Sequence, residues 1–286
     1  MFSARGAVRS MKEWMDFGIG YLESRNVADA KTDAWLLMEY AANIDKNYYY
    51  MNMHSPMDAG DAEDYYILLE RRGEHIPVQY LTGEAWFYGY PFRVNSHVLI
   101  PRQDTEILVE EALKLLNPGD HILDLCTGSG CILLTLIKKA KVTGVGTDLS
   151  PEALVVAELN RKLLHVNANW ICSDLFEHVG GRFQMIVSNP PYIPTKDIEM
   201  LDAEVKDHEP RMALDGDADG LEFYRRIIAG AGSYLTDGGY LLLEVGYNQG
   251  PDVSAMMERH GFTNVRVTKD LSGLDRVVTG QLELLQ

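Results

Sequence analysis

The feature of the sequence that most constrains the fold is a regular alternation of strand-like and helix-like segments in the second half of the chain. Short runs rich in apolar and β-branched residues predict strands at residues 121–125, 142–147, 170–172, 183–188, 240–245, 265–267 and 276–284. Segments with helical apolar spacing lie between them, at residues 131–140, 151–164, 221–235 and 253–260. This alternation predicts an α/β domain whose parallel sheet is covered by helices on both faces.

The first part of the chain follows a different pattern and predicts a separate, smaller domain. Apolar residues recur at helical spacing in residues 1–75, which we expect to form a helical bundle. The aromatic run Tyr48 to Tyr50 fits either the core of this bundle or a partner surface. Two short aromatic segments on either side of Gly89 predict a β-hairpin linker over residues 76–100. Residues 101–286 would then form the α/β domain, starting with a helix at about residues 104–116.

The composition narrows the class of partner and the compartment. The formal net charge is −16, whereas proteins that grip nucleic acid phosphates usually carry a basic surface, so no direct nucleic acid partner is expected. No stretch approaches the ~18 apolar residues of a membrane-spanning helix. The apolar run of a secretion signal does not follow residues 1–9, because Lys12, Glu13 and Asp16 interrupt the segment where it would lie. Cys126, Cys131 and Cys172 have no zinc-binding spacing. Three unpaired cysteines favour a reducing cytoplasm, and no metal site is expected.

The turn after the first of these strands is the candidate cofactor site. It reads Asp124-Leu125-Cys126-Thr127-Gly128-Ser129-Gly130, and its glycines allow a tight turn close to a ligand, where open sheets bind nucleotides. A dinucleotide site would need glycine at position 133, which is leucine. A phosphate-binding loop would need lysine and then serine or threonine after Gly130, where Cys131 and Ile132 stand. The remaining candidate is a nucleoside ligand without phosphate, namely S-adenosylmethionine.

Acidic residues after successive strands fit the parts of this ligand. Asp148 ends the second strand about 20 residues beyond Gly128, where a carboxylate can accept hydrogen bonds from both ribose hydroxyls. The alternative is that Asp148 caps the following helix. Asp174, after the third strand, is placed to accept from the adenine amine, while Leu175 packs on the ring. Asp124 ends the first strand and is expected to help orient the methionine end.

The fourth strand ends in Asn189-Pro190-Pro191-Tyr192, the candidate catalytic segment. Proline has no backbone N–H, and a residue before proline is held extended. The side-chain oxygen of Asn189 and the carbonyl of Pro190 would therefore form a rigid pair of acceptors, beside the flat wall of Tyr192. A planar nitrogen with two hydrogens, from an amide or an aromatic amine, fits this surface and would face the sulfonium methyl. Such orientation can contribute ~7–11 kcal/mol. The alternative is an ordinary turn built from turn-prone residues.

These motifs resemble a known family. Asn-Pro-Pro-Tyr is typical of methyltransferases that act on amino groups of adenine, cytosine, guanine or glutamine, and the sequence around it is more specific. Further matching segments are Pro77-Val78-Gln79-Tyr80-Leu81-Thr82-Gly83, Val98-Leu99-Ile100-Pro101-Arg102, Glu209-Pro210, Asp219-Gly220-Leu221, Leu243-Glu244, Gln249-Gly250 and Asp275-Arg276-Val277-Val278. From about residue 77 onward the chain resembles the release factor glutamine methyltransferases, the HemK/PrmC family.

The resemblance implies a Rossmann-like, class I S-adenosylmethionine-dependent methyltransferase sheet whose last strand is antiparallel. It also implies a protein methylation linked to translation termination: the substrate would be the glutamine in the Gly-Gly-Gln loop of class 1 peptide chain release factors. By motif match, the cofactor would contact Cys126, Thr127, Gly128, Ser129, Gly130, Asp148 and Asn189, and the glutamine would be held by Asn189, Pro190, Pro191 and Tyr192. The family usually has glycine at position 126 and proline and glutamate at positions 103 and 104, where this chain has Cys126, Gln103 and Asp104.

Two other functions fit part of the pattern. A nucleic acid methyltransferase shares the Asn-Pro-Pro-Tyr chemistry but should carry a basic recognition domain, whereas residues 1–75 are rich in acids. A non-catalytic binding protein with this fold should have lost an acceptor or the ribose acid, yet Asn189, Tyr192 and Asp148 are all present. We also expect the helical domain to recognise the release factor, with the acidic surface complementing a basic region near its glutamine loop.

Two further features are an acidic segment and an arginine. Residues 215–220 mimic the start of a calcium loop, but the required glutamate at its twelfth position is replaced by Arg226, so we expect a surface loop instead. Arg102 would either reach the active site or pair with acidic side chains.

Overall fold

The computed structural model describes residues 9–283, and the chain divides into two compact units between Gly83 and Glu84. Each unit has an apolar core of its own. Residues 1–8, where no secretion signal is expected, and the expected end of the last strand at Leu284 lie outside the described residues. The finer division of the chain at residues 75 and 100 stays a prediction.

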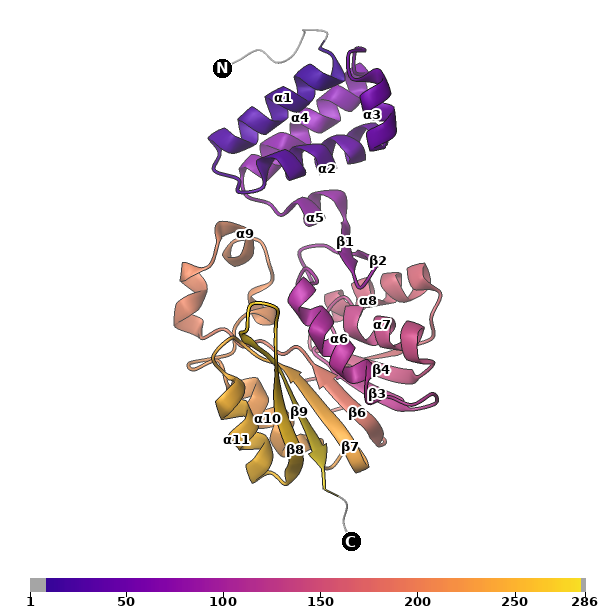
Figure 1. The fold of residues 1–286 in the computed structure, drawn as a ribbon, viewed down its shortest axis with the longest axis vertical. Coiled ribbons are helices and arrows are strands. Elements are labelled where there is room, and N and C mark those ends of the chain that lie inside the picture. The colour runs from indigo at the N-terminus through magenta and orange to yellow at the C-terminus, as the bar shows by residue number, and fades with distance from the viewer. Residues whose placement is uncertain (1–8, 284–286) are drawn as a thin grey trace. The chain divides into compact units, whose positions relative to one another are not determined.

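The N-terminal unit is the helical bundle that the apolar spacing predicts. Its helices are α1 (Met11–Ser24), α2 (Ala30–Ala42), α3 (Lys46–Asn52), α4 (Ala59–Gly73) and α5 (Val78–Thr82), as Figure 1 shows. Leu22, Leu37 and Tyr65 are fully buried where α1, α2 and α4 face one another. A Cβ added to Gly18 of α1 would stand 2.1 Å from the Tyr65 hydroxyl, so glycine allows α1 and α4 to pack closely.

The aromatic run of α3 is divided between core and surface. Tyr49 is buried and packs edge-on against Trp35, with 5.4 Å between the ring centroids. Tyr48 and Tyr50 on either side of it are 49% and 68% exposed. The prediction that these tyrosines belong to the bundle core is therefore right for Tyr49 but not for Tyr48 and Tyr50.

The second unit starts with the predicted hairpin, formed by β1 (Glu84–Phe87) and β2 (Tyr90–Arg93) in antiparallel pairing. The rings of Phe87 and Phe92 meet edge-to-face at 6.0 Å and are almost completely buried. They share one apolar cluster with Leu108 and Leu133. The hairpin is thus anchored in the core of the second unit.

Seven strands form one sheet in the order β5-β4-β3-β6-β7-β9-β8. They are β3 (His121–Leu125), β4 (Thr143–Asp148), β5 (Asn169–Cys172), β6 (Phe183–Ser188), β7 (Leu235–Glu244), β8 (Phe262–Lys269) and β9 (Asp275–Leu282). The strands from β5 to β7 pair in parallel, whereas β9 lies antiparallel to both β7 and β8. This confirms the α/β sheet that the alternation predicts and the antiparallel last strand that the resemblance implies.

Helices cover both faces of this sheet. They are α6 (Glu106–Leu113), preceded by η1 (Gln103–Thr105), α7 (Cys131–Ala140), α8 (Pro151–Leu164), α10 (Glu222–Ala231) and α11 (Gly250–Arg259). In Figure 1, α10 and α11 lie on one side of the strands, and α6 and α7 lie on the other. Adjacent residues of β6 point to opposite faces: Ile186 joins the cluster under α10 and α11, and Val187 joins the cluster under α6 and α7.

The structure corrects the predicted boundary between α10 and β7. The spacing predicts a helix to residue 235 and a turn at residues 237–239, but the helix ends at Ala231 and β7 already starts at Leu235. The pairing of β7 with β6 shifts register between Phe183 and Met185, opposite the glycine pair Gly238-Gly239. Glycines in a strand pattern can mark such an irregularity as well as a turn.

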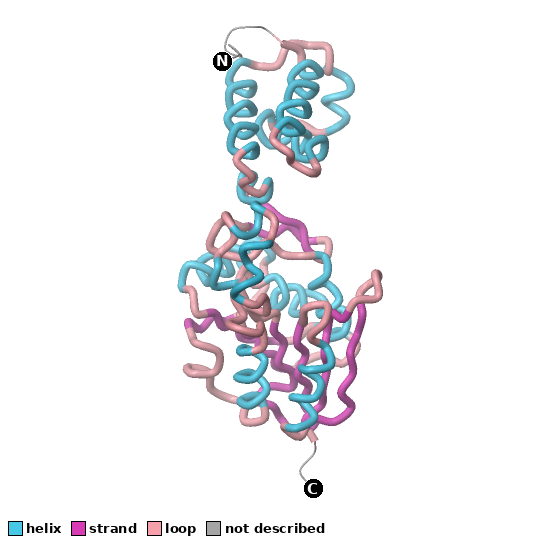
Figure 2. The backbone as a smooth tube through the Cα atoms, turned by 90° about the vertical axis from the view of Figure 1, so that its left-hand side faces the viewer, coloured by secondary structure: helices cyan, strands magenta, loops and turns pink. Residues whose placement is uncertain are grey.

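A long connection, which we call the excursion, joins β6 to α10, and the sequence pattern did not predict its short helices. It contains η2 (Thr195–Met200), α9 (Ala203–Lys206) and η3 (Arg211–Ala213), which are too short to show helical periodicity. The excursion ends where Asp215 pairs with Ile193 in an isolated parallel bridge. Figure 1 labels α9 beyond one end of the sheet, and Figure 2 shows loops and short helical turns at that end of the strands.

Candidate active site

A cavity of about 290 Å³ lies at the carboxyl ends of the parallel strands, close to the size of a typical small-ligand pocket. The loops after β3, β4, β5 and β6 all reach it, so residues far apart in sequence meet there. Lining residues that the sequence analysis singled out are Arg102, Cys126, Thr127, Gly128, Ser129, Asp148, Asp174, Leu175, Asn189 and Pro191. Of the residues that we expected to contact the ligands, Asp124, Gly130, Pro190 and Tyr192 are not part of this lining.

The glycine loop after β3 is shaped by three residues with positive φ. Cys126, Gly128 and Gly130 have φ values of 57°, 54° and 79°. A Cβ added to Gly128 would meet nothing within 4 Å, whereas one added to Gly130 would stand 2.9 Å from the ring of Trp170. Gly128 therefore leaves space open in the cavity, and Gly130 allows the loop to pack on β5. The left-handed conformation at Cys126 is one that glycine adopts without strain, which fits the glycine that the family usually has there.

Asp148 connects this loop to the end of β4. Its Oδ2 accepts a hydrogen bond from the Gly128 backbone N–H at 2.8 Å, and its Oδ1 accepts one from the Ser150 N–H at 3.0 Å. Burial raises the pKa of Asp148, and these backbone donors oppose the shift. The cap of α8 is Ser150, whose hydroxyl accepts from the Ala153 N–H at 3.1 Å. Asp148 thus faces the cavity rather than serving as the cap.

Asp124 lies beneath the loop. It is completely buried, and its Oδ2 accepts a hydrogen bond from the Thr127 hydroxyl at 2.6 Å. Burial raises the pKa of this carboxyl to about 7, against the lowering effect of the Thr127 hydrogen bond. Asp124 therefore orders the residue that precedes Gly128 and acts on the cavity through the loop.

The loop after β5 carries a second acidic residue of the cavity. The Asp174 carboxylate pairs with Arg226 at 2.8 Å, and the guanidinium of Arg226 lies 5.9 Å from the ring centroid of Phe223. Phe223 also lines the cavity, a role that the sequence analysis missed because only the fold brings α10 to this loop. Leu175 is buried with a φ of 49°, so a strained backbone presents it to the cavity.

Asn189 is held in one orientation by a hydroxyl from η1. Its Nδ2 donates to the Thr105 Oγ1 at 3.3 Å. Since the amide nitrogen faces Thr105, the amide oxygen is the atom left to accept from a ligand. Thr105 and Asn189 both line the cavity, and Thr105 is only 2% exposed. This arrangement fits the acceptor role expected of Asn189.

Behind Asn189 and Tyr192 lies a buried acid that the sequence analysis did not single out as a site residue. Glu244, at the end of β7, is 1% exposed and accepts from the Tyr192 hydroxyl at 3.5 Å. Burial raises the pKa of Glu244 to about 7, while a hydrogen bond from Thr105 and the charge of Arg276 lower it. Burial also raises the pKa of Tyr192 well above its usual range. We call Asn189 to Tyr192 the acceptor segment. Glu244 is hydrogen-bonded to Tyr192 at one end of this segment and to Thr105, which holds Asn189 at the other end.

Arg102 pairs with Glu209 and also lines the cavity, so both alternatives left open for it hold. The Glu209 side chain is buried, and its second oxygen accepts from the Ile100 N–H at 3.3 Å. The pair joins two of the segments that carry the family resemblance. Within residues 9–283, no group of three or more His, Cys, Asp and Glu side chains is arranged to hold a metal ion.

The sheet order, the glycine turn after β3, the acid after β4 and Asn-Pro-Pro-Tyr after β6 together define a class I S-adenosylmethionine-dependent methyltransferase. Residues 13–83 match the model of the PrmC N-terminal domain, and residues 102–205 match that of the methyltransferase small domain. The chain therefore belongs to the family of release factor glutamine methyltransferases, since it is 40% identical to that of Geobacter sulfurreducens, over 96% of this chain and 97% of the relative. It is 39% identical to that of Agrobacterium fabrum, over 90% and 92%.

Solved structures share the fold of the second unit. A methyltransferase from Pyrococcus furiosus superposes with a TM-score of 0.55, covering 75% of this chain and 99% of that chain at 16% identity. The 16S rRNA N2 G1207 methyltransferase of T. thermophilus, solved with AdoMet and guanosine, gives a TM-score of 0.53, covering 70% and 50% at 20% identity. At these identities the likeness shows the fold alone.

Proposed function

We propose that this enzyme holds the glutamine of a release factor on Asn189 and the Pro190 carbonyl, beside Tyr192. As a release factor glutamine methyltransferase, it transfers the methyl group of S-adenosylmethionine to the side-chain amide nitrogen of glutamine, and the resemblance assigns that glutamine to the Gly-Gly-Gln loop of class 1 factors. The observation that supports the assignment most is the Thr105–Asn189 hydrogen bond at 3.3 Å, because it directs the Asn189 oxygen toward a ligand in the cavity.

The cavity fits the cofactor. Gly128 leaves open space where any other residue would place a Cβ, and the Asp148 carboxylate beside it suits ribose hydroxyls. Asp174, Leu175 and Phe223 form a second part of the wall, suited to a flat base with an exocyclic amine. We assign the methionine end to the loop from Cys126 to Gly130, with Asp124 acting beneath it.

Methyl transfer to the amide depends more on the placement of its nitrogen than on an acidic or basic side chain. When bound, the cofactor supplies an electrophilic methyl group, and transfer forms an N–C bond while the C–S electron pair stays on sulfur. An amide nitrogen is a poor nucleophile, but two accepted N–H hydrogen bonds raise its electron density and fix its approach to the methyl group. The extra proton leaves the nitrogen after transfer, so no side chain has to remove it beforehand.

The partner we propose is a class 1 release factor, bound partly by the N-terminal helical unit, with no direct nucleic acid contact required. The net charge of −16 complements a basic surface, as expected near a loop that enters a ribosomal RNA site. Added salt should then slow methylation, and salt-independent rates would contradict this electrostatic contribution.

No helix among residues 9–283 is long and apolar enough to cross a membrane. We propose that the protein works in the cytoplasm, where its substrate is made.

The test is a methyl-transfer assay with radiolabelled S-adenosylmethionine and three candidate acceptors. These are a release factor, the same factor with its loop glutamine replaced, and duplex DNA. Label on the intact factor alone supports the proposal. Asn189→Ala should then lower turnover by about a hundredfold or more, the usual effect of removing one pre-organised active-site hydrogen bond. Label on DNA would keep the nitrogen chemistry but overturn the substrate, and undiminished turnover by the variant would overturn the role of Asn189.

A further inference from the structure

Gln249, between β7 and α11, uses both ends of its side-chain amide to join three separate loops. Its Oε1 accepts from the Gly246 N–H at 2.9 Å and from the Tyr224 hydroxyl at 3.3 Å. Its Nε2 donates to the Tyr192 carbonyl at 3.0 Å and to the Gly220 carbonyl at 3.2 Å. The residue is 7% exposed, and three of the four bonds are buried, while the bond to the Tyr192 carbonyl is partly buried. Only a primary amide offers two donors and two acceptor sites in one neutral side chain.

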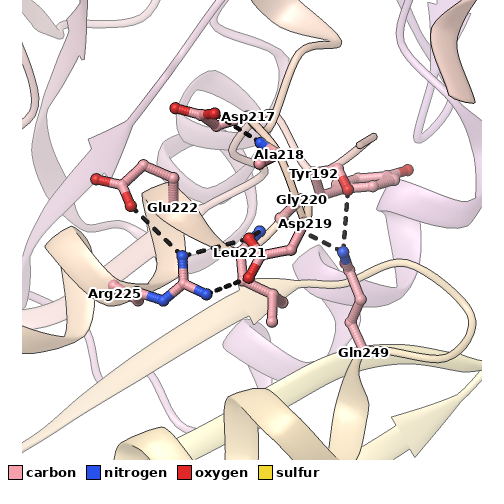
Figure 3. Close-up of polar contacts among 9 residues, drawn as sticks. All are labelled: Tyr192, Asp217, Ala218, Asp219, Gly220, Leu221, Glu222, Arg225 and Gln249. Atoms are coloured by element: carbon pink, nitrogen blue, oxygen red, sulfur yellow. Dashed lines mark hydrogen bonds and ion pairs between the residues drawn. The ribbon is translucent and has the colours of Figure 1, made fainter. Parts of the chain in front are cut away.

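The hydrogen bond from Gln249 to the Tyr192 carbonyl matters because of where Tyr192 lies in the chain. The ladder between β6 and β7 ends at Ser188, so the sheet does not fix the backbone of residues 189–192. Pro190 and Pro191 have no N–H with which to anchor it. Figure 3 shows the Gln249 side chain reaching from its own loop to the Tyr192 carbonyl, beside Gly220. Glu244 at the end of β7 accepts from the Tyr192 hydroxyl, and Gln249 just before α11 donates to the Tyr192 carbonyl, so Tyr192 is held at both its phenol and its backbone.

The loop at residues 214–220 supports the same backbone from another direction. The Ile193 N–H donates to the Leu214 carbonyl at 3.0 Å, and the Gly216 N–H donates to the Ile193 carbonyl at 2.8 Å. A Cβ added to Gly216 would stand 2.8 Å from the Tyr192 Cα, and one added to Gly220 would stand 2.4 Å from the Tyr192 oxygen. The segment that mimics a calcium loop is therefore packed directly against the acceptor segment, and Gln249 joins the two.

The other end of this loop is tied to α10. Figure 3 shows the Asp219 carboxylate paired with Arg225, which also meets Glu222. Asp219 Oδ1 in addition accepts from the Leu221 N–H at 3.0 Å. These exposed contacts order the loop locally, whereas Gln249 is the one residue drawn in Figure 3 that hydrogen-bonds to Tyr192.

We propose that Gln249 is a positioning residue for methyl transfer: its amide fixes the Tyr192 backbone, and with it the Asn189–Tyr192 acceptor segment, relative to the cofactor cavity. This inference rests on the proposed role of that segment in holding the glutamine. Gln249 touches neither the cavity nor a reacting atom, so its loss should lower turnover while the cofactor still binds. Misplacement of a substrate by about 1 Å can slow a reaction by about a hundredfold.

The test compares Gln249→Glu with wild type in the full-length enzyme. Glutamate keeps the acceptor oxygen for Gly246 and Tyr224, but as a carboxylate it cannot donate to Tyr192. Single-turnover methylation of a release factor at saturating cofactor should slow by at least about tenfold at pH 8. Affinity for S-adenosylhomocysteine, measured by calorimetry, should change by less than about threefold.

Acid should rescue the variant, which a merely structural role would not predict. A buried glutamic acid protonates readily, and its O–H can donate to the Tyr192 carbonyl again. The ratio of variant to wild-type rate should therefore rise severalfold from pH 8 to pH 6. Neighbouring titratable and charged groups are Tyr192, Tyr224, Glu244, Asp275 and Arg276. They are common to both proteins, so the ratio cancels their titration to first order.

Gln281→Glu is the matched control. The Gln281 Nε2 also donates to a backbone carbonyl, that of Gly238, at 3.0 Å, but in the sheet away from the cavity. This variant should keep wild-type turnover at both pH values. The inference is overturned if Gln249→Glu turns over like wild type at pH 8, if its rate ratio does not rise with acid, or if cofactor affinity falls as much as the rate.

A second variant covers the case in which Gln249→Glu does not fold. Gln249→Met removes the hydrogen bonds without adding charge, and it should show the same loss of turnover with retained cofactor affinity, without acid rescue. Methylation of the release factor by the wild-type enzyme, and its loss in Asn189→Ala, tests the proposed function separately. Failure there is thus distinguishable from failure of the role of Gln249.

Discussion

The backbone N–H of Gly128 donates to the Asp148 carboxylate at 2.8 Å, which joins the glycine loop after β3 to the acid at the end of β4. The two residues lie on neighbouring parallel strands, whose carboxyl ends meet at the same edge of the sheet. The bond holds the loop and the carboxylate in fixed positions before any ligand enters. Such preorganisation lowers the ordering cost of binding, and it leads to the first prediction.

Asp148→Asn should weaken cofactor binding by about ten- to a hundredfold, the effect of losing hydrogen bonds to a charged group. Both carboxylate oxygens accept from backbone N–H groups, of Gly128 and Ser150, whereas asparagine has one acceptor oxygen. One N–H would then face the amide NH₂. Calorimetric titration with S-adenosylhomocysteine measures the change. Glu152→Gln, an exposed change in the first turn of α8, should bind like wild type. Equal affinity of Asp148→Asn and wild type would remove Asp148 from the cofactor site.

Gly130→Ala should destabilise the second unit more than a matched change elsewhere. The φ of Gly130 is 79°, and a Cβ there would stand 2.9 Å from the Trp170 ring. Gly89 has nearly the same φ, 78°, with nothing within 4 Å of an added Cβ. Gly89→Ala should therefore cost ~1 kcal/mol from backbone strain alone, and Gly130→Ala ~2–4 kcal/mol once overpacking is added. Urea unfolding measures the free energy of unfolding of both variants. Equal losses of stability would mean that the Trp170 ring moves aside at no cost.

Thr105→Val should lower turnover by about tenfold, and Thr105→Ser should restore most of it. The Thr105 hydroxyl accepts from the Asn189 Nδ2 at 3.3 Å, and valine removes this contact while keeping a similar shape. Without it, the Asn189 amide can turn and present its NH₂ to the glutamine instead of its oxygen. Steady-state kinetics with the release factor would show the loss mainly in kcat. A serine variant as slow as the valine variant would assign the effect to packing instead.

The stability difference between Asp124→Asn and wild type should depend on pH. Burial raises the pKa of Asp124 from 3.8 to about 7 in the folded protein. A raised folded pKa contributes stability that is fully present below the unfolded pKa and is lost as pH rises through the folded pKa. Between pH 5 and pH 8 the wild type should therefore lose up to about 3 kcal/mol relative to the variant, which does not titrate. Urea unfolding at the two pH values measures this, and a constant difference would mean that Asp124 keeps its ordinary pKa when folded.

The local structure of several candidate site motifs was predictable, because the local sequence specifies it. The turn from Asp124 to Gly130 and the segment from Asn189 to Tyr192 each follow a strand directly, and glycine and proline restrict their backbones in ways that hold in any fold. Asp148 was expected for the same reason. Only the structure shows why glycine would suit position 126, because Cys126 has a φ of 57°, a conformation that glycine adopts without strain.

By itself, the sequence determined the α/β sheet, the helical bundle ahead of it, the hairpin and the motifs at the ends of β3, β4 and β6, because periodicity and turn residues act over a few neighbouring positions. The tertiary structure decided which side chains stand behind those motifs. Thr105 in η1 hydrogen-bonds to Asn189, whereas Glu244 at the end of β7 and Gln249 just before α11 hydrogen-bond to Tyr192. No local pattern marks such residues, since their role depends on contacts that form only when distant segments are packed together and sheltered from water.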